Sequence, residues 1–206
     1  YDNKAKDLIR HAARQRWKIG DNDFAVIFAS MNFELKGLDH IIHSLAKLRA
    51  EGAKVKLIVA GKGNVKKYQN IAQKAQMSDN IVFTGVLPAD QLVNLYLSGD
   101  IYMMLSGFDT FGMVVPEAMA AGLPVVISDR VGAKDLVREG ENGFVIENPS
   151  DYEYLASRVK ILMDKTRHKS MSAAARETAL GNSWEKTTDR YREIYAQILD
   201  TKTSKR

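Results

Sequence analysis

Residues 100–128 read "DIYMMLSGFDTFGMVVPEAMAAGLPVVIS" and contain the clearest indication of the fold class. The apolar run at 100–105 predicts a buried strand, and a glycine-containing loop follows it. The apolar run at 113–122 predicts a short helix, and 124–128 predicts a second strand. Strand, helix and strand in this order are typical of a unit whose two strands are parallel. The segment therefore predicts one βαβ unit of an α/β protein.

The same alternation continues on both sides of this segment. Further apolar strands are predicted at 23–30, 54–61, 80–85 and 143–147. Helices are predicted at 2–18, 36–52, 64–76, 89–99, 132–138, 150–164, 167–181 and 183–199. Six apolar strands alternating with helices indicate a parallel sheet covered on both faces. Right-handed crossovers then favour a Rossmann-like, doubly wound, six-stranded parallel sheet with additional C-terminal helices.

Length and composition narrow the class of protein. The chain has 206 residues, of which 45% are hydrophobic, enough for one domain with extra helices and short for two full domains. It has no cysteine, which excludes disulfides and a zinc–thiolate site and fits a reducing compartment. No run reaches the roughly 18 apolar residues of a spanning helix. The first residues, "YDNKAKDLIR", lack a signal peptide's apolar segment and an initiator Met. We therefore expect a cytoplasmic piece of a longer chain.

The formal net charge is +5, and the basic residues are spread along the chain. A denser group at the start comprises Lys4, Lys6, Arg10, Arg14, Arg16 and Lys18. A nucleic-acid binder more often concentrates its cations and interleaves them with aromatic residues, so we expect no nucleic-acid partner. Two interpretations of the positive charge remain: solvated helix faces, or a surface that attracts phosphate-bearing ligands or an anionic membrane.

Ligands of such sheets bind beyond the carboxyl ends of the strands, where two loops are informative. Gly61 and Gly63 follow one strand and would let a ligand approach the backbone closely. The third glycine and the later acid of a dinucleotide-binding motif are missing, which disfavours a dehydrogenase. Lys36 lies between a strand and the start of a helix. It is either a phosphate-binding cation or a surface lysine.

The sequence predicts no metal site. The "DND" at 21–23 looks like the Asp-x-Asp motif of some sugar-transfer enzymes, but it precedes a strand, so we interpret it as a turn at the wrong end of the sheet. The histidines form no ligand set, and we expect them on the solvated surface. They are His11, His40, His43 and His168.

Two carboxylates flank the loop and helix of the opening segment. Asp109 lies in the loop, Glu117 lies in the first turn or so of the helix, and Gly112 between them permits close backbone approach. Three interpretations stay open for this pattern. Glu117 could interact with the helix dipole. It could accept two hydrogen bonds from a vicinal diol such as a ribose. The two acids could also form a hydrolytic pair.

The stretch "DTFGMVVPEAMAAGLPVV" (109–126) resembles the signature of retaining glycosyltransferases of the GT-B architecture, the glycosyl transferases group 1 family. That signature has an acid, seven residues, a Glu and then Ala-Met-Ala-Ala-Gly-x-Pro-Val. Other segments that match it in order are 59–63, 82–106, 131–149 and 183–195. Residues 32–48, "NFELKGLDHIIHSLAKL", are similar, more weakly, to the lipopolysaccharide-core glucosyltransferase branch.

The resemblance implies that the chain is the nucleotide-sugar-binding half of an enzyme that transfers a sugar to a hydroxyl acceptor with retention. Carried over by position, Glu117 would bind the ribose hydroxyls, Asp109 the donor-sugar hydroxyls, and Lys36 the diphosphate. Donor-binding backbone is implied at Gly61, Lys62, Gly63, Val86, Leu87, Phe111, Gly112, Met113 and Val114.

The resemblance also implies an organisation and partners. Residues 1–20 would be a linker with a helix, 21–182 the nucleotide-sugar domain, 183–200 a crossover helix, and 201–206 a disordered tail. The expected partners are an N-terminal acceptor domain of the same protein and a nucleotide sugar, first of all a UDP-sugar, with GDP- and ADP-sugars open. We expect no metal or other cofactor. The expected role is cell-surface polysaccharide or lipopolysaccharide synthesis, with peripheral association at the inner face of the membrane as an option.

Two positions depart from the family pattern. Its first acid is usually Glu, and Asp109 is one methylene shorter. An Arg usually accompanies the loop lysine, whereas Met31 and Leu35 occupy the candidate positions here, with Lys62 as a substitute cation. A non-catalytic nucleotide-sugar-binding or scaffolding domain is therefore the main alternative. An epimerase would need a different acid–base set.

Overall fold

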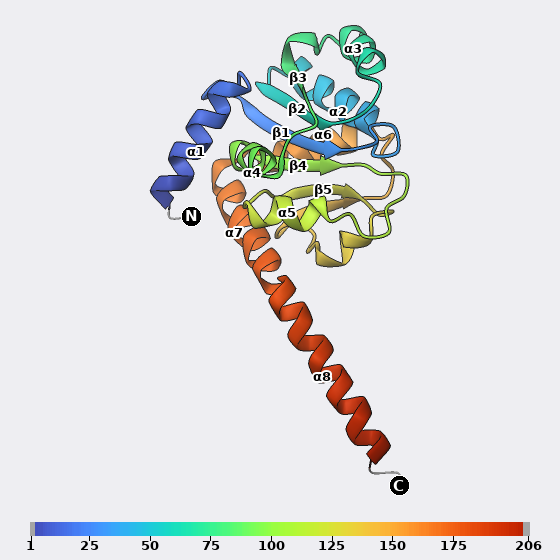
Figure 1. Ribbon diagram of the computed structural model, residues 1–206. Coiled ribbons are helices and arrows are strands. Elements are labelled where there is room, and N and C mark those ends of the chain that lie inside the picture. Colours follow the sequence, from blue (N-terminus) through green and yellow to red (C-terminus); the bar gives the residue numbers. More distant parts are fainter. Residues whose placement is uncertain (1–2, 204–206) are drawn as a thin grey trace.

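A computed structural model describes residues 3–203, and the side chains of residues 7–199. Within these residues the chain forms a six-stranded parallel sheet in the order β3-β2-β1-β4-β5-β6 (Figure 1). The strands are β1 (Phe24–Ser30), β2 (Val55–Gly61), β3 (Ile81–Gly85), β4 (Ile101–Met104), β5 (Val125–Ser128) and β6 (Gly143–Ile146). The predicted doubly wound α/β fold is confirmed.

Helices precede the first strand, connect successive strands and follow the last one. They are α1 (Asn3–Arg16), α2 (Leu38–Ala50), α3 (Val65–Lys74), α4 (Ala89–Ser98), α5 (Val114–Ala120), α6 (Tyr152–Leu162), α7 (Lys165–Gly181) and α8 (Trp184–Thr203). Two short 3₁₀ helices lie at Ser78–Asn80 and Gly132–Leu136. The second stands where the sequence predicts a short helix at 132–138.

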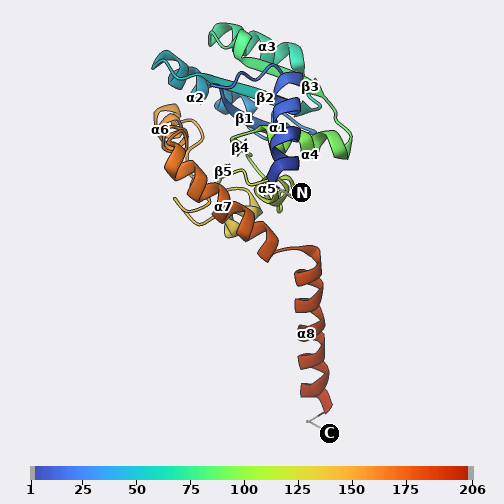
Figure 2. The same cartoon turned by 90° about the vertical axis from the view of Figure 1, so that its left-hand side faces the viewer.

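The sheet is covered on both faces, which explains the uninterrupted apolar strands. Helices α2, α3 and α6 pack on one face, whereas α1, α4, α5 and part of α7 pack on the other (Figure 2). Along β1, Val26 and Phe28 belong to the first core, and Ala25, Ile27 and Ala29 to the second. Because both faces are buried, alternation between apolar and polar residues is absent from β1.

The strand order reverses at β1, whose neighbours are β2 on one side and β4 on the other. The loops that follow β1 and β4 are held together by their backbones. The N–H of Leu105 donates to the carbonyl of Lys36 at 3.2 Å. Gly37 has a φ of 68°, and a Cβ there would lie 2.2 Å from the Leu105 carbonyl oxygen. The topological switch point, where such folds bind ligands, is therefore also the position of Lys36.

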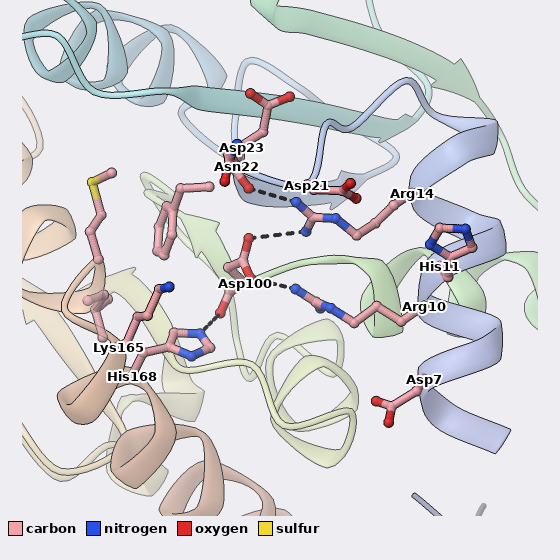
Figure 3. Close-up of a pocket in the computed structure, with 13 residues that line it drawn as sticks. Asp7, Arg10, His11, Arg14, Asp21, Asn22, Asp23, Asp100, Lys165 and His168 are labelled. Atoms are coloured by element: carbon pink, nitrogen blue, oxygen red, sulfur yellow. Dashed lines mark hydrogen bonds and ion pairs between the residues drawn. The ribbon is translucent and has the colours of Figure 1, made fainter. Parts of the chain in front are cut away.

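At the other end of the strands, just before β4 begins, Asp100 joins α1 and α7 to the sheet (Figure 3). Its carboxylate lies 2.6 Å from Arg10 and 3.4 Å from Arg14, and it accepts the N–H of Ala25 at 2.6 Å. Nε2 of His168 donates to the carbonyl of Asp100 at 2.7 Å. Asp100 thus fixes the helix that precedes the first strand.

The expected turn at 21–23 is confirmed, because Asp23 accepts the N–H of Gly20 at 2.7 Å before β1 begins. The expectation of solvated histidines is wrong for two positions besides His168. The rings of His40 and His43 are half-buried against Tyr152, at 6.0 and 5.2 Å between centroids. In the part of the chain that the structure describes, no three His, Cys, Asp or Glu side chains could jointly hold a metal ion.

Helix α8 projects away from the body of the molecule (Figure 1). It exposes Trp184, Tyr191, Ile194 and Tyr195. It extends to Thr203, so the first three residues of the tail predicted at 201–206 are helical; residues 1–2 and 204–206 lie outside the described ones. The other predicted domain boundaries stay a prediction. Among the described residues, no helix combines the length and the apolar character needed to cross a membrane.

Candidate functional site

Lys36 and Asp109 form an ion pair at the switch point. Nζ of Lys36 lies 2.5 Å from Oδ2 of Asp109 and donates to the carbonyl of Phe108 at 3.3 Å. The two side chains are only 16% and 17% exposed. They are 73 positions apart in sequence, yet β1 and β4 are neighbouring parallel strands whose following loops meet. The fold thus brings together two of the predicted site residues.

The backbone fixes Asp109 as firmly as the ion pair does. Its N–H donates to the carbonyl of Arg130 at 3.0 Å, and its own carbonyl accepts from Gly132 at 3.1 Å. Its Oδ1 accepts the N–H of Phe111 at 3.2 Å. Both carboxylate oxygens of Asp109 therefore have partners within the protein, one of them a cation.

Glu117 lies in the first turn of α5, beside α4. The hydroxyl of Tyr96 donates to its Oε2 at 3.4 Å. Although Glu117 is accessible to solvent, the neighbouring helix excludes part of the water around its carboxyl group. This partial burial raises the pKa of Glu117 above its ordinary value of 4.5, and the hydrogen bond from Tyr96 opposes the rise. Glu117 also lines a cavity of about 490 Å³ between α4 and α5, whose walls include Leu92, Val93 and Ala120.

Tyr102 of β4 links the surroundings of the two acids. It is fully buried, and its hydroxyl donates to the carbonyl of Ala29 at 3.2 Å. Its ring packs edge-to-face on Tyr96, with centroids 6.1 Å apart. Burial is the main reason why the pKa of Tyr102 is raised, and the charges of Glu117 and Asp109 add to the effect. The sequence analysis missed both tyrosines, although a tyrosine in a buried strand signals a hydrogen-bond partner.

Packing of the chain itself requires glycine at two of the predicted donor-binding positions. Gly61 has a φ of 111°, and a Cβ there would lie 1.8 Å from the Ser30 carbonyl oxygen. A Cβ at Gly63 would lie 2.3 Å from the ring of Phe33. The approach of a ligand to these glycines stays a prediction.

Gly112→Ala tests how much room the loop before α5 has. Gly112 has a φ of 86°, and a Cβ would lie 3.0 Å from side-chain atoms of Met104 and Val131. We expect the free energy of unfolding to fall by about 1–3 kcal/mol, measured by urea denaturation. Gly140→Ala is the matched control, because Gly140 has a φ of 74° and no atom within 4 Å of a Cβ. Equal losses at both positions would show that the contacts at Gly112 add nothing to backbone strain.

The remaining predicted residues lie at the same edge of the sheet, in the loops after β1 to β4 or at the start of α5. Exposed residues are Lys62, Val86, Phe111 and Met113, and half-buried ones are Leu87 and Val114. Met31 and Leu35, at the positions expected for an arginine, are 64% and 42% exposed. Exposed apolar side chains therefore occupy both positions expected for the arginine.

Comparison with known proteins identifies the family of the chain. Residues 9–178 match the glycosyl transferases group 1 family. The chain belongs to this family. Among curated relatives, the GDP-mannose-dependent alpha-mannosyltransferase of Corynebacterium glutamicum is 30% identical over 145 residues, which are 70% of this chain and 34% of that protein.

Solved structures of glycosyltransferases have the same fold. Alr3699/HepE of Anabaena, in complex with UDP and glucose, is 25% identical with a TM-score of 0.77, covering 96% of this chain and 52% of that one. WaaG, a glycosyltransferase involved in lipopolysaccharide biosynthesis, is 25% identical with a TM-score of 0.73, covering 83% and 46%. This group 1 chain therefore spans between about a third and about half of the length of these relatives.

Proposed function

We propose that this chain is the donor-binding half of a retaining glycosyltransferase, which transfers a sugar from a nucleoside-diphosphate sugar to a hydroxyl acceptor. The observation that carries the proposal is the placement of Lys36, Asp109 and Glu117 beyond the carboxyl ends of β1 and β4. Membership of group 1, the transferase names of two relatives and the UDP and glucose bound to HepE support it.

The chemistry of the site matches the parts of such a donor. The carboxylate of Glu117 would accept two hydrogen bonds from the ribose hydroxyls. Lys36, next to the N-terminus of α2, would offset the charge that develops on the departing diphosphate. We expect no metal or other cofactor. We expect no side-chain nucleophile, and none is needed if the acceptor attacks the face from which the diphosphate leaves.

The proposed donor is a UDP-sugar, because the HepE structure contains UDP and glucose. GDP-sugars remain a competing donor class, because the Corynebacterium relative is named for GDP-mannose. ADP-sugars are the third donor class that the binding experiment below includes. We propose that the enzyme acts in the synthesis of lipopolysaccharide or another cell-surface polysaccharide, which the likeness to WaaG supports.

The missing half would be an N-terminal acceptor domain of the same protein. The exposed face of α8 at Trp184, Tyr191 and Tyr195 would pack on it as a crossover helix. We propose a cytoplasmic location, with the assembled protein at the inner face of the membrane.

Titration calorimetry of the chain with UDP, GDP and ADP tests the proposal. We expect one clear preference and no turnover of nucleotide sugar by the isolated chain. If the folded chain binds none of the three, the donor-half proposal is wrong. The exposed Met31 and Leu35 favour one rival, a non-catalytic nucleotide-sugar-binding domain. Activity of the longer protein with a panel of donors separates the two.

Tyr96→Phe tests the electrostatics of Glu117. Ribose binding needs the ionised carboxylate, so nucleoside diphosphate affinity should fall as pH drops through the Glu117 pKa, which burial places above 4.5. Removing the Tyr96 hydroxyl removes a bond that lowers this pKa. The acid limb of the affinity profile should therefore move to higher pH in the variant, with little change at neutral pH. A limb that stays in place would exclude Tyr96 from tuning Glu117. Tyr152→Phe, on the other face of the sheet, is the matched control.

A further inference from the structure

The acid at position 109 faces the lysine. Its Oδ2 lies 2.5 Å from Nζ of Lys36, and its Oδ1 accepts the N–H of Phe111. A carboxylate has about four acceptor sites, and these two partners occupy two of them. Here the strongest interaction of Asp109 is with the cation that would meet the diphosphate.

The ammonium group of a lysine has three N–H donors. In Lys36 one donates to Asp109 and one to the carbonyl of Phe108, which leaves the third for a ligand. We propose that Asp109 is a positioning residue that holds Nζ of Lys36 in place for the donor's diphosphate. This inference rests on the proposed function.

The length of the Asp109 side chain fits this role. The main chain of Asp109 is fixed on both sides, to Arg130 and to Gly132. From this fixed Cα the short side chain reaches both Lys36 and the N–H of Phe111. A glutamate would carry its carboxylate one carbon further, so it could keep both contacts only in a different side-chain conformation.

Holding the lysine matters because it works without the usual arginine. The positions expected for that arginine are Met31 and Leu35. A free lysine side chain loses rotamer entropy when a ligand immobilises it. In this structure Asp109 and Phe108 have already restricted Lys36, so the diphosphate would meet a cation that is ordered before binding.

A double-mutant cycle in the 206-residue chain tests the proposal, with calorimetry of UDP and uridine, or of whichever diphosphate and nucleoside pair binds best. We expect Lys36→Met and Asp109→Asn each to weaken the diphosphate about tenfold. Both should leave the nucleoside nearly unchanged, and the double variant should be no weaker than Lys36→Met alone. Tighter diphosphate binding by Asp109→Asn would mean that the acid competes with the ligand for the lysine. Additive losses would mean that it acts on the ligand directly. Either result overturns the proposal.

The nucleotide sugar separates the two roles of the acid. Positioning of Lys36 predicts that Asp109→Asn weakens binding of UDP itself, which carries no sugar for the acid to contact. A loss for the UDP-sugar with unchanged affinity for UDP would overturn the proposal and would leave only the sugar contact that the family resemblance implies. Asp109→Glu is a second variant that keeps the charge. It should also weaken the diphosphate, and an unchanged affinity would contradict the positioning role.

Controls keep this experiment distinct from the test of the donor site. Glu51→Gln breaks an exposed ion pair with Lys160, 2.6 Å long, at the other end of α2 and should leave every affinity unchanged. Thermal melting confirms that each variant is folded. If the wild-type chain binds no nucleoside diphosphate, the proposed function fails and this inference with it. If it binds one without coupling between Lys36 and Asp109, only the inference fails.

Discussion

Replacing Asp100 by alanine should lower the free energy of unfolding by about 3–5 kcal/mol, because one partner of a largely buried ion pair is removed. The carboxylate joins Arg10 and Arg14 of α1 to the start of β4 and to the N–H of Ala25 (Figure 3). The Arg14 side chain is only 9% exposed and would lose its anionic partner while staying buried. Urea denaturation of the chain measures the loss.

An exposed ion pair provides the control for Asp100. Glu51→Ala removes the partner of Lys160 at the surface and should cost less than about 1 kcal/mol. Asp100→Asn keeps the shape and should fall between the two. If Asp100→Ala lowers the free energy of unfolding no more than Glu51→Ala does, then α1 is held mainly by the apolar contacts of Ala13 and of Trp17, the residue that follows the helix. The ion pairs and hydrogen bonds of Asp100 would then contribute little to the stability of the fold.

Glu117→Ala should weaken binding of the preferred nucleoside diphosphate about a hundredfold. Two hydrogen bonds from the ribose hydroxyls to a carboxylate would be lost, at roughly 1.5 kcal/mol or more each, and every 1.4 kcal/mol is tenfold in affinity. The fold should be unaffected, because Glu117 is a solvent-accessible helix position and alanine favours helix. Calorimetry and thermal melting measure the two effects.

A deoxyribose ligand identifies the contact that Glu117 makes. The wild-type chain should bind the 2′-deoxy form of its nucleoside diphosphate more weakly than the ribose form, and Glu117→Ala should discriminate much less. Glu193→Ala, on the exposed face of α8, should change neither value. An unchanged affinity in Glu117→Ala would remove the residue from the donor site and would favour the interpretation of Glu117 as a first-turn acid that interacts with the helix dipole.

Local patterns predicted most of the architecture, and the reason is physical. Strands such as β1 are buried on both faces, so they appear as continuous apolar runs, and the helices between them show helical spacing. The element boundaries differ by a few residues at most, for example at α2, which begins at Leu38 because Gly37 adopts a left-handed conformation before it. The positions of Asp109 and Glu117 after β4 followed from the same patterns.

Interactions that join distant segments were not predictable in this way. Arg10 and Arg14 appear as two more cations in a basic helix, yet they anchor α1 to Asp100. Tyr96 and Tyr102 appear as core aromatics, yet the hydroxyl of Tyr96 donates to Glu117 and that of Tyr102 donates to the carbonyl of Ala29. No local signal distinguishes such side chains from solvated or purely apolar ones.

Hydrophobic periodicity and loop composition are local properties, so the order of the amino acids alone predicts the α/β class, the covered parallel sheet and the edge at which a ligand would bind. The tertiary structure decided that Lys36 meets Asp109, and that Glu117 meets Tyr96. Strand order sets these meetings: β1 and β4 become neighbours only when the sheet assembles, and residues 73 positions apart then share one loop cluster.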